Sequence, residues 1–299
     1  AALLLPLLLA GPVAASLALA PLALLSEAML GLVRLLDALG AVRVVPTPLF
    51  AETLLLALLL AAAGSLRARR PRRAALAGAL VVVFLVSARP SAAERAGEAR
   101  LVALDVGQGD AFLVSTESGR VLVDGGGTFD AADDFGRKRL LPRLAALGAV
   151  SFDAIVLTHP HPDHSRGLLA ALKLLPAGRL FLPRSAPRNP FLDEALGAAA
   201  RAGVPAESLS AGDRFTAAGV VFEVLHPGPE TYPRSPENNG SLVLRLRLGS
   251  RSVLLTGDVE AAAESDLVAR GGPLRADVLK VPHHGSRTST TPAFLEKVA

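Results

Sequence analysis

The 299-residue sequence contains no cysteine, no tryptophan and a single tyrosine. Without cysteine the chain has no disulfide framework and no thiolate metal site, so any metal must be bound by His, Asp or Glu. Charged residues make up only 19% of the chain, below the roughly 25% that is usual in soluble domains. Hydrophobic residues make up 51%, which excludes a largely disordered protein and argues against a wholly soluble one.

Lysine is also rare, and nearly all of the positive charge is carried by arginine. The formal net charge of +4 is therefore only weak support for an anionic partner such as a nucleic acid. The first residue is Ala1, and residues 294–299 resemble the middle of a helix. We expect the chain to be a piece of a longer protein.

The first part of the chain has long stretches with little or no charge. Residues 1–26 carry no charged side chain, and as a helix they would span about 39 Å at about 1.5 Å per residue, enough for a bilayer core of about 30 Å. A signal peptide is the alternative, but these residues lack a basic start. Residues 27–45 show the pattern of an amphipathic helix, and residues 49–66 and 74–88 are apolar again.

Residues 67–73, which separate the last two apolar stretches, contain five arginines. Such a basic cluster is typical of the cytoplasmic side of a membrane segment, and a nucleic-acid patch is the alternative. We predict a multi-pass membrane region over residues 1–90, located in the inner or plasma membrane, and a linker over residues 91–98. Residues 99–299 would then form a hydrolase domain on the extracytoplasmic side.

From residue 101 the sequence consists of short apolar runs separated by Gly, Pro and Asp, which is typical of strands. This pattern predicts an α/β domain with layered sheets and helices outside them. We predict strands over residues 101–106, 111–115, 121–124, 154–158, 179–182, 220–225, 241–248, 252–256 and 277–281, and helices over residues 137–147, 165–175, 190–202 and 260–270.

Three of the six histidines fall within six residues, in the segment from His159 to His164. They directly follow the apolar run 154–157, so we expect them in a loop at the end of a strand, where ligands are held rigidly. In an extended loop His159 and His161 project to the same side, while Asp163 and His164 lie at the start of a helix. Nitrogen and oxygen donors of this kind suit zinc or manganese. A solvated His-rich turn is the alternative.

Two later strands also end in potential metal ligands. Asp258 follows the apolar run that ends in Thr256, and His283 and His284 follow the run that ends in Val281. Alone, an Asp after Gly is usually a helix cap, and paired histidines are often surface residues. Together with His159 to His164, however, three strand ends deliver donors, which predicts a metal site.

The segment from His159 to His164 matches the HxHxDH signature of the metallo-β-lactamase fold superfamily. Within it, residues 101–110, 123–126, 256–258 and 281–286 resemble the C-terminal domain of ComEC-type DNA internalisation proteins of natural competence. The resemblance implies an αββα sandwich with a dinuclear site at one edge, holding two divalent ions (Zn or Mn). Residues 1–90 resemble the end of that family's membrane region more loosely.

The resemblance also implies the ligands. It assigns His159 and His161 to the first metal, Asp163 and His164 to the second, and Asp258 to a bridge between them. Of the two late histidines, His283 is the better match for the last ligand of the second metal, and His284 would then face the substrate. Members of the superfamily commonly add a third histidine to the first metal, and the only candidate here is His226, which can equally be a structural residue at a strand end.

The catalytic residues implied are Asp163, His164, Asp258 and His284. Two divalent ions would lower the pKa of a water between them and so provide a nucleophile without a protein base. The hydroxyl groups of Ser286, Thr288 and Ser289 are candidate phosphate ligands, and an ordinary polar loop is the alternative. Further polar residues match the family strings and are expected to shape turns or to hydrogen-bond to ligands without touching metal; they are Asp105, Gln108, Asp110 and Asp124.

The function implied is a membrane-tethered, metal-dependent phosphodiesterase or nuclease that hydrolyses DNA, the non-imported strand, during natural transformation. Its partners would be DNA, the membrane and other DNA-uptake proteins, with no organic cofactor. Two alternatives stay open at this point: a hydrolase of a small phosphodiester, lactone or thioester, and a DNA-guiding module without turnover. The intact HxHxDH string argues against the last of these.

Overall fold

The computed structural model describes residues 27, 30–31, 35, 44–87, 97–130 and 132–299. The chain divides into the units 1–43 and 44–299, and only the second is described below. The predicted membrane segment over residues 1–26, most of the predicted amphipathic helix over 27–45 and most of the predicted linker over 91–98 lie outside the described residues.

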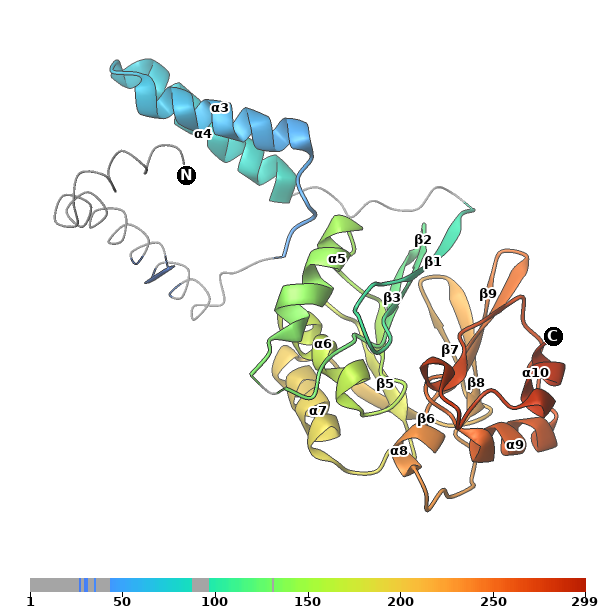
Figure 1. Ribbon diagram of the computed structural model, residues 1–299. Helices are drawn as coiled ribbons and strands as arrows, with labels where there is room; N and C mark the ends of the chain where they lie inside the picture. The colour runs from blue at the N-terminus through green and yellow to red at the C-terminus, as the bar shows by residue number, and fades with distance from the viewer. Residues whose placement is uncertain (1–26, 28–29, 32–34, 36–43, 88–96, 131) are drawn as a thin grey trace, which may run out of the picture. The chain divides into compact units, whose positions relative to one another are not determined.

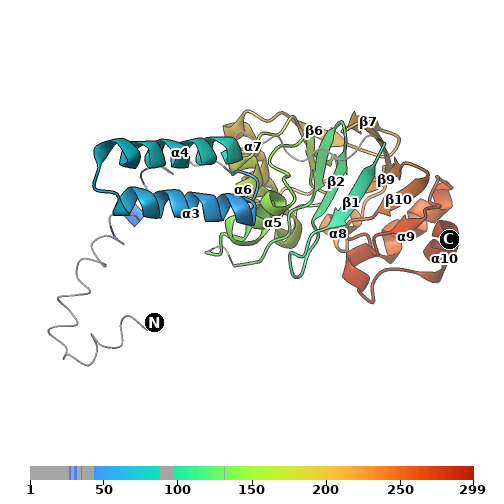
Figure 2. The same ribbon diagram turned by 90° about the horizontal axis from the view of Figure 1, so that it is seen from above.

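Two helices come first, α3 (Phe50–Ser65) and α4 (Arg69–Ser87), and they form an antiparallel pair (Figures 1 and 2). The residues buried in them are mostly small, Ala63 in α3 and Ala75 and Ala79 in α4, which lets two helices approach closely. Among the described residues, no helix combines the length and the apolar character needed to cross a membrane. Residues 50–65 and 74–87 of the two apolar stretches are helical, and their place in a membrane stays a prediction.

The rest of the chain contains two sheets that face each other (Figures 1 and 2). The first sheet has the order β1-β2-β3-β4-β5-β6, in which β1, β2 and β3 pair antiparallel and β3 to β6 pair parallel. Its strands are β1 (Ala99–Ala103), β2 (Phe112–Thr116), β3 (Gly119–Val123), β4 (Ala154–Val156), β5 (Leu180–Pro183) and β6 (Ala206–Leu209).

The second sheet has the order β11-β10-β9-β8-β7, with only β10 and β11 parallel. Its strands are β7 (Arg214–Ala217), β8 (Val220–His226), β9 (Val243–Leu248), β10 (Arg251–Leu255) and β11 (Val278–Leu279). The remaining elements are η1 (Gly136–Leu140), α5 (Leu141–Ala146), α6 (Pro162–Leu174), α7 (Pro190–Ala202), α8 (Pro236–Asn239), α9 (Ala261–Arg270), η2 (Pro282–Gly285) and α10 (Pro292–Val298).

Alternating side chains on the strands build the layers. In β3, Val121 and Val123 point into the core between the sheets, where they meet Phe222 and Val224 of β8, whereas Leu122 points outward under α5, α6 and α7. Phe222 is completely buried, and burial of such a side chain stabilises the fold by about 1.5–3 kcal/mol. The outer face of the second sheet is covered by α9 and α10. The predicted αββα sandwich is confirmed.

Most of the predicted strands and helices are present within a few residues of their predicted ends. The sequence did not predict β6 and β7, because most of their side chains are exposed and show no apolar alternation. The short helix α8, within residues 228–240, was not predicted either. The helix predicted over 165–175 starts at Pro162 instead, which places Asp163 and His164 in its first turn, as expected.

Candidate metal centre

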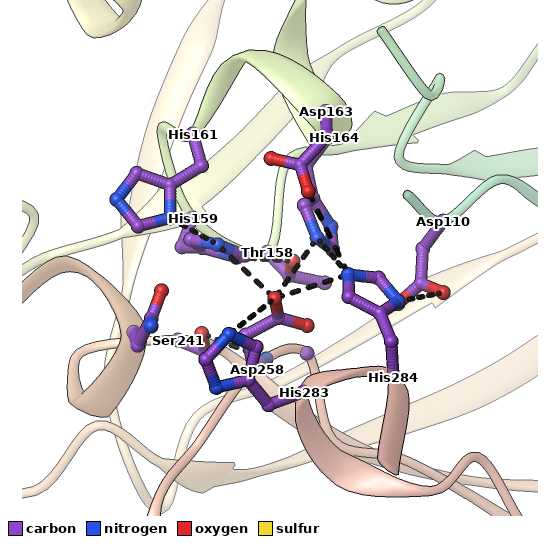
Figure 3. Close-up of polar contacts among 12 residues, drawn as sticks. Asp110, Thr158, His159, His161, Asp163, His164, Ser241, Asp258, His283 and His284 are labelled. Carbon is purple, nitrogen blue, oxygen red and sulfur yellow. Dashed lines mark hydrogen bonds and ion pairs between the residues drawn. The ribbon is translucent and has the colours of Figure 1, made fainter. Parts of the chain in front are cut away.

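Parallel strand pairs bring the candidate ligands to one edge of the sandwich. In the first sheet β3 and β4 run parallel, and in the second sheet β10 and β11 do so, so each pair ends side by side. The chain leaves β4 into His159 and β10 into Asp258, and it leaves β11 into His283 and His284. Ligands bind at the carboxyl ends of strands in many open α/β sheets, and this edge collects most of the predicted site (Figure 3).

The loop after β4 positions the first donors. His159 is fully buried, and its Nε2 atom lies 3.2 Å from Nδ1 of His161, so the two imidazoles point to the same side as predicted. Pro162 then starts α6 at the first helical position, where its missing N–H and fixed φ are compatible with a helix. Asp163 and His164 follow in the first turn.

Asp124, at the end of β3, fixes the orientation of His164. One carboxylate oxygen of Asp124, Oδ2, lies 2.9 Å from Nδ1 of His164 and accepts from the Thr158 hydroxyl at 2.7 Å, while Oδ1 accepts from the Thr158 N–H at 2.7 Å. All three side chains are buried. A carboxylate that holds one ring nitrogen of a histidine leaves the other nitrogen free for a metal. Asp124 thus contacts a candidate ligand from behind, and the indirect role predicted for it stays a prediction.

Asp258 lies at the centre of the cluster (Figure 3). Its backbone N–H donates to Oγ of Ser241 at 3.2 Å, and its side chain is 2% exposed. From Oδ2 the distances are 3.3 Å to Nε2 of His164, 3.2 Å to Nε2 of His284 and 3.9 Å to Nε2 of His159. Asp258 therefore faces both histidine groups, as a bridging ligand must.

His283 and His284 exchange the places that the resemblance implied. His284 enters the cluster, with Nε2 3.2 Å from Nε2 of His164, whereas Nε2 of His283 lies 3.9 Å from Asp258 and its Nδ1 3.3 Å from Glu260. Both residues have left-handed backbone conformations, with φ of 47° and 52°. Such residues are uncommon away from functional sites, and two in succession turn the side chains in directions that strand alternation does not predict.

Asp110 also differs from its prediction, because it lies in the cluster rather than behind the ligands. One ligand atom each from Asp110, His164, Asp258 and His284 lie within 4.8 Å of one another. Asp110 Oδ1 is 3.4 Å from Nδ1 of His284. The preceding Gly109 has φ of 96°, and a β-carbon there would overlap the carbonyl oxygen of Asp163. Only glycine allows this close approach, which brings Asp110 beside the segment 159–164, called the metal-binding loop below for its proposed role.

Lys280 is a buried residue of the site that the sequence analysis did not single out. Its Nζ atom donates to Oδ2 of Asp110 at 2.6 Å, to Oδ1 of Asp258 at 3.1 Å and to the Gly257 carbonyl at 2.7 Å. The side chain is only 7% exposed. Lysine is rarely buried unless it is paired, and its position directly after an apolar run was the available signal.

His226 is not brought to the cluster. It is fully buried, with Nε2 donating to the Asn239 carbonyl at 2.7 Å and Nδ1 accepting from Nη2 of Arg270 at 2.8 Å. Since both ring nitrogens already have partners, His226 is not available as a ligand in this arrangement. Its role here is structural, because it joins the end of β8 to α8 and α9.

The remaining predicted residues lie around the site or away from it. The Thr288 hydroxyl is 3.3 Å from Nδ1 of His283 and 3.0 Å from the Ser286 hydroxyl, whereas the Ser289 hydroxyl donates to the Val259 carbonyl at 2.9 Å. Asp105 is exposed, accepts from the Gly107 N–H at 3.3 Å and pairs with Arg143, so it shapes a turn. Gln108 is exposed.

The charged groups of the cluster shift one another's pKa values. Burial and the neighbouring imidazole of His164 hold the pKa of His159 well below its usual value, so this ring is neutral. Burial opposes a charge on His164, but the carboxylates of Asp124 and Asp258 raise its pKa to about 10. Hydrogen bonds to Asp110, Asp163 and Asp258 raise the pKa of His284 to about 11. In the absence of metal, protons on these two rings and Lys280 balance the carboxylates.

The donor set fits one or more divalent metal ions. Imidazole nitrogens and carboxylate oxygens are the ligands of zinc and manganese in proteins without cysteine ligands. Asp110, His164, Asp258 and His284 form the compact group. The paired imidazoles of His159 and His161 lie on another side of Asp258 (Figure 3).

The model of the Metallo-beta-lactamase superfamily matches residues 104–299. The chain belongs to this superfamily. It carries the superfamily's fold with a candidate metal site, and we describe it as a metal-binding hydrolase domain. Among solved structures, a B3 metallo-beta-lactamase with an active-site glutamic acid is similar at 16% identity with a TM-score of 0.44, covering 69% of this chain and 85% of that chain.

Two competence proteins are similar over most of this chain. It is 35% identical over 229 residues to ComE operon protein 3 of Bacillus subtilis, covering 73% of this chain and 29% of the relative. It is 34% identical over 222 residues to Competence protein ComA of Neisseria gonorrhoeae, covering 74% of this chain and 28% of the relative. The predicted resemblance to competence proteins is confirmed, and the chain spans less than a third of the length of either relative.

Proposed function

We propose that this chain is the hydrolase domain of a DNA-uptake protein and that it cleaves phosphodiester bonds of DNA with the help of two divalent metal ions. The observation that carries the proposal is the cluster of imidazoles and carboxylates around Asp258. Its relatives are competence proteins, which makes DNA the expected substrate. The non-imported strand is the substrate that the resemblance implies.

Two groups of residues would hold the ions, on either side of Asp258. His159 and His161 form one group, and Asp110, His164 and His284 form the other. Divalent cations bound there would supply an activated water and would stabilise negative charge on the reacting phosphate. Neutral imidazole is the form of histidine that binds metal, and burial keeps the pKa of His159 low enough for that form.

The partly exposed side chains of the cluster define where a substrate would enter. Asp163, His283 and His284 are 21%, 27% and 24% exposed, whereas Asp258 and His164 are almost completely buried. A phosphate would therefore approach past Asp163 and His283. Nδ1 of His283 faces Glu260 at 3.3 Å, which leaves Nε2 as the ring nitrogen that can face the substrate. His283 thus takes the substrate-facing role that the resemblance implied for His284.

The loop after the two histidines would complete the phosphate site. The hydroxyls of Ser286 and Thr288 lie 3.0 Å apart, beside His283. Glu264, which is fully buried, accepts the backbone N–H groups of Thr290 and Thr291 and so fixes the end of this loop. The Ser289 hydroxyl donates to the Val259 carbonyl. Ser289 would therefore support the loop and would not contact the phosphate.

Attachment to a membrane is part of the proposal. Large apolar side chains are exposed on both early helices, including Phe50 at 83% and Phe84 at 68%, and arginines gather between Arg67 and Arg73. Such surfaces suit apolar lipid chains flanked by anionic headgroups. The proposed location is the inner or plasma membrane, with the hydrolase domain on the extracytoplasmic side and other DNA-uptake proteins as partners.

A hydrolysis assay with the 299-residue chain tests the function. We expect cleavage of DNA when Mn²⁺ or Zn²⁺ is added, and loss of cleavage in the variants Asp163→Ala and His164→Ala. Val221→Ala, on an exposed position of β8, is the control and should cleave normally. Cleavage of small phosphodiesters but not of DNA would instead indicate a small-molecule hydrolase, and DNA binding without any cleavage would indicate a guiding module.

A further inference from the structure

Two phenylalanines and an arginine lie next to the metal-binding loop without taking part in the cluster. They are Phe129, in the loop after β3, Phe191, in the first turn of α7, and Arg166, in α6. Phe129 is 72% exposed, more than any other large hydrophobic side chain within the described residues 97–299. We name these three residues the aromatic platform. The metal chemistry described above does not use them.

Close backbone contacts fix the platform beside the metal-binding loop. Gly127, two residues before Phe129, has φ of 157°, and a β-carbon there would overlap the carbonyl oxygen of Pro162 and lie 2.9 Å from Cβ of Arg166. On the other side, Asn189 caps the start of α7 by accepting from the Leu192 N–H at 2.9 Å. The Asn189 side chain also donates to the Pro160 carbonyl at 3.4 Å.

The three side chains contact one another in the order Phe129, Phe191, Arg166. The rings of Phe129 and Phe191 meet edge to face, with centroids 6.5 Å apart and an interplanar angle of 87°. Cζ of Arg166 lies 5.4 Å from the centroid of the Phe191 ring, within the range of a cation–π contact. Phe191 therefore packs against the exposed Phe129 ring, and Arg166 in turn packs against Phe191.

Arg166 links the platform to the metal centre. It follows Asp163 by three residues in α6, and side chains at that spacing lie on the same helix face. Its Nε atom is buried and has no hydrogen-bond partner among the described residues, and its ion pair with Glu194 is loose at 3.9 Å. The Arg166 side chain is 11% exposed, so its positive charge lies just below the surface, against the Phe191 ring.

We infer that the aromatic platform binds an unpaired base of single-stranded DNA next to the phosphate held at the metal centre. This inference rests on the proposed phosphodiesterase function and adds the strand form of its substrate. The exposed ring of Phe129 offers a face on which any base can stack, and the charge of Arg166 behind Phe191 attracts the anionic backbone. In a duplex the base faces are already stacked on one another, so the site would favour single strands over duplex DNA.

Binding of two single strands of equal length tests the inference, one of oligothymidylate and one without bases. The 299-residue chain is used with EDTA, so that cleavage does not interfere. We expect the wild type to prefer oligothymidylate, and Phe129→Ala to weaken its binding about tenfold while binding of the abasic strand stays unchanged. Phe129→Trp should keep the preference, Phe129→Leu should lose it despite its apolar side chain, and Val221→Ala should behave as wild type.

The outcomes separate this inference from the proposed function. If the wild type hydrolyses DNA with Mn²⁺ but Phe129→Ala binds both strands as the wild type does, the aromatic platform does not bind a base. The proposed nuclease function is then unaffected. If Phe129→Ala weakens binding of oligothymidylate but the wild type hydrolyses no DNA, base binding by the platform is supported and the proposed nuclease function is contradicted. Tighter binding of duplex than of single strand would also overturn the platform.

Discussion

Lys280 and Asp258 form a buried ion pair, in which Nζ lies 3.1 Å from Oδ1 of the carboxylate. The lysine also reaches Asp110 at 2.6 Å, so it neutralises two carboxylates that would hold a metal. Removing one partner of a buried ion pair is costly, because the remaining charge stays buried without compensation. Here a divalent cation can provide that compensation.

We therefore expect Lys280→Met to lower the free energy of unfolding of the metal-free chain by about 3–5 kcal/mol, and Mn²⁺ to restore most of the loss. Denaturant unfolding with and without Mn²⁺ measures both effects. The exposed Lys173 provides the control variant Lys173→Met, which should change neither value. A loss in Lys280→Met that Mn²⁺ leaves unchanged would show that Lys280 stabilises the fold independently of the metal site.

The adjacent histidines provide a matched pair of variants. His284→Ala should weaken Mn²⁺ binding strongly, because its Nε2 lies within 3.2 Å of both Asp258 and His164. His283→Ala should bind Mn²⁺ nearly as the wild type does but lose hydrolysis. Calorimetric titration with Mn²⁺ and a DNA cleavage assay measure the two effects. The reverse pattern would restore the assignment that the family resemblance implied.

Asp124→Asn tests the support behind the ligands. The substitution removes the carboxylate that holds Nδ1 of His164 at 2.9 Å but keeps the size of the side chain. Loss of such a partner typically lowers metal affinity about 10–100-fold, and we expect a decrease in this range by titration. Asp105→Asn, at an exposed turn, is the control. Equal affinity in the two variants would mean that Asp124 does not orient His164.

His226 should be structural. We expect His226→Ala to leave the number of metal ions per chain unchanged, measured by atomic emission after dialysis, and to lower stability because Asn239 and Arg270 lose their buried partner. An unsatisfied buried polar group costs about 1–3 kcal/mol. A lower metal content in a folded His226→Ala chain would identify His226 as a ligand after all.

Stability should depend on pH strongly without metal and only weakly with metal. The pKa values of His164 and His284 rise from 6.5 to about 10 and about 11 on folding. Their protons therefore stabilise the metal-free fold fully below pH 6.5, and this stability is lost as the pH rises through the folded-state values. We expect the free energy of unfolding to fall above pH 6.5, by about 1.4 kcal/mol per pH unit for each proton.

Metal binding displaces these protons, so affinity for Mn²⁺ should increase with pH over the same range. The metal-loaded chain should accordingly lose little stability between pH 7 and pH 9, when unfolding is followed by circular dichroism. A metal-free chain with constant stability across this range would show that the two imidazoles are not protonated in the cluster.

The sequence predicted the parts of the site that depend on neighbouring residues. His159, His161, Asp163 and His164 follow one buried strand, and their relative directions depend only on an extended loop and a helix start. Short apolar runs such as residues 121–124 predicted the strands of a layered α/β domain, and the family resemblance predicted the αββα sandwich. The strands β6 and β7 contain no such apolar run and were missed.

The contributions that the sequence did not predict depend on distant parts of the chain. Lys280 is buried against Asp110. Asp110 lies 170 residues earlier in the chain, between β1 and β2 of the first sheet, whereas Lys280 follows β11 of the second sheet. The left-handed backbone at His283 and His284 decides which ring enters the cluster, and no residue-type preference indicates it. His226 could not be assigned because Arg270, its partner, lies on a separate helix.

Anomalous X-ray scattering from crystals of the chain grown with Mn²⁺ tests the central claim most directly. We expect a manganese peak bounded by Asp110, His164, Asp258 and His284, and a second one beside His159 and His161. Absence of any peak at this edge of the sandwich, or manganese bound only elsewhere, would contradict the assignment of the cluster as a metal centre.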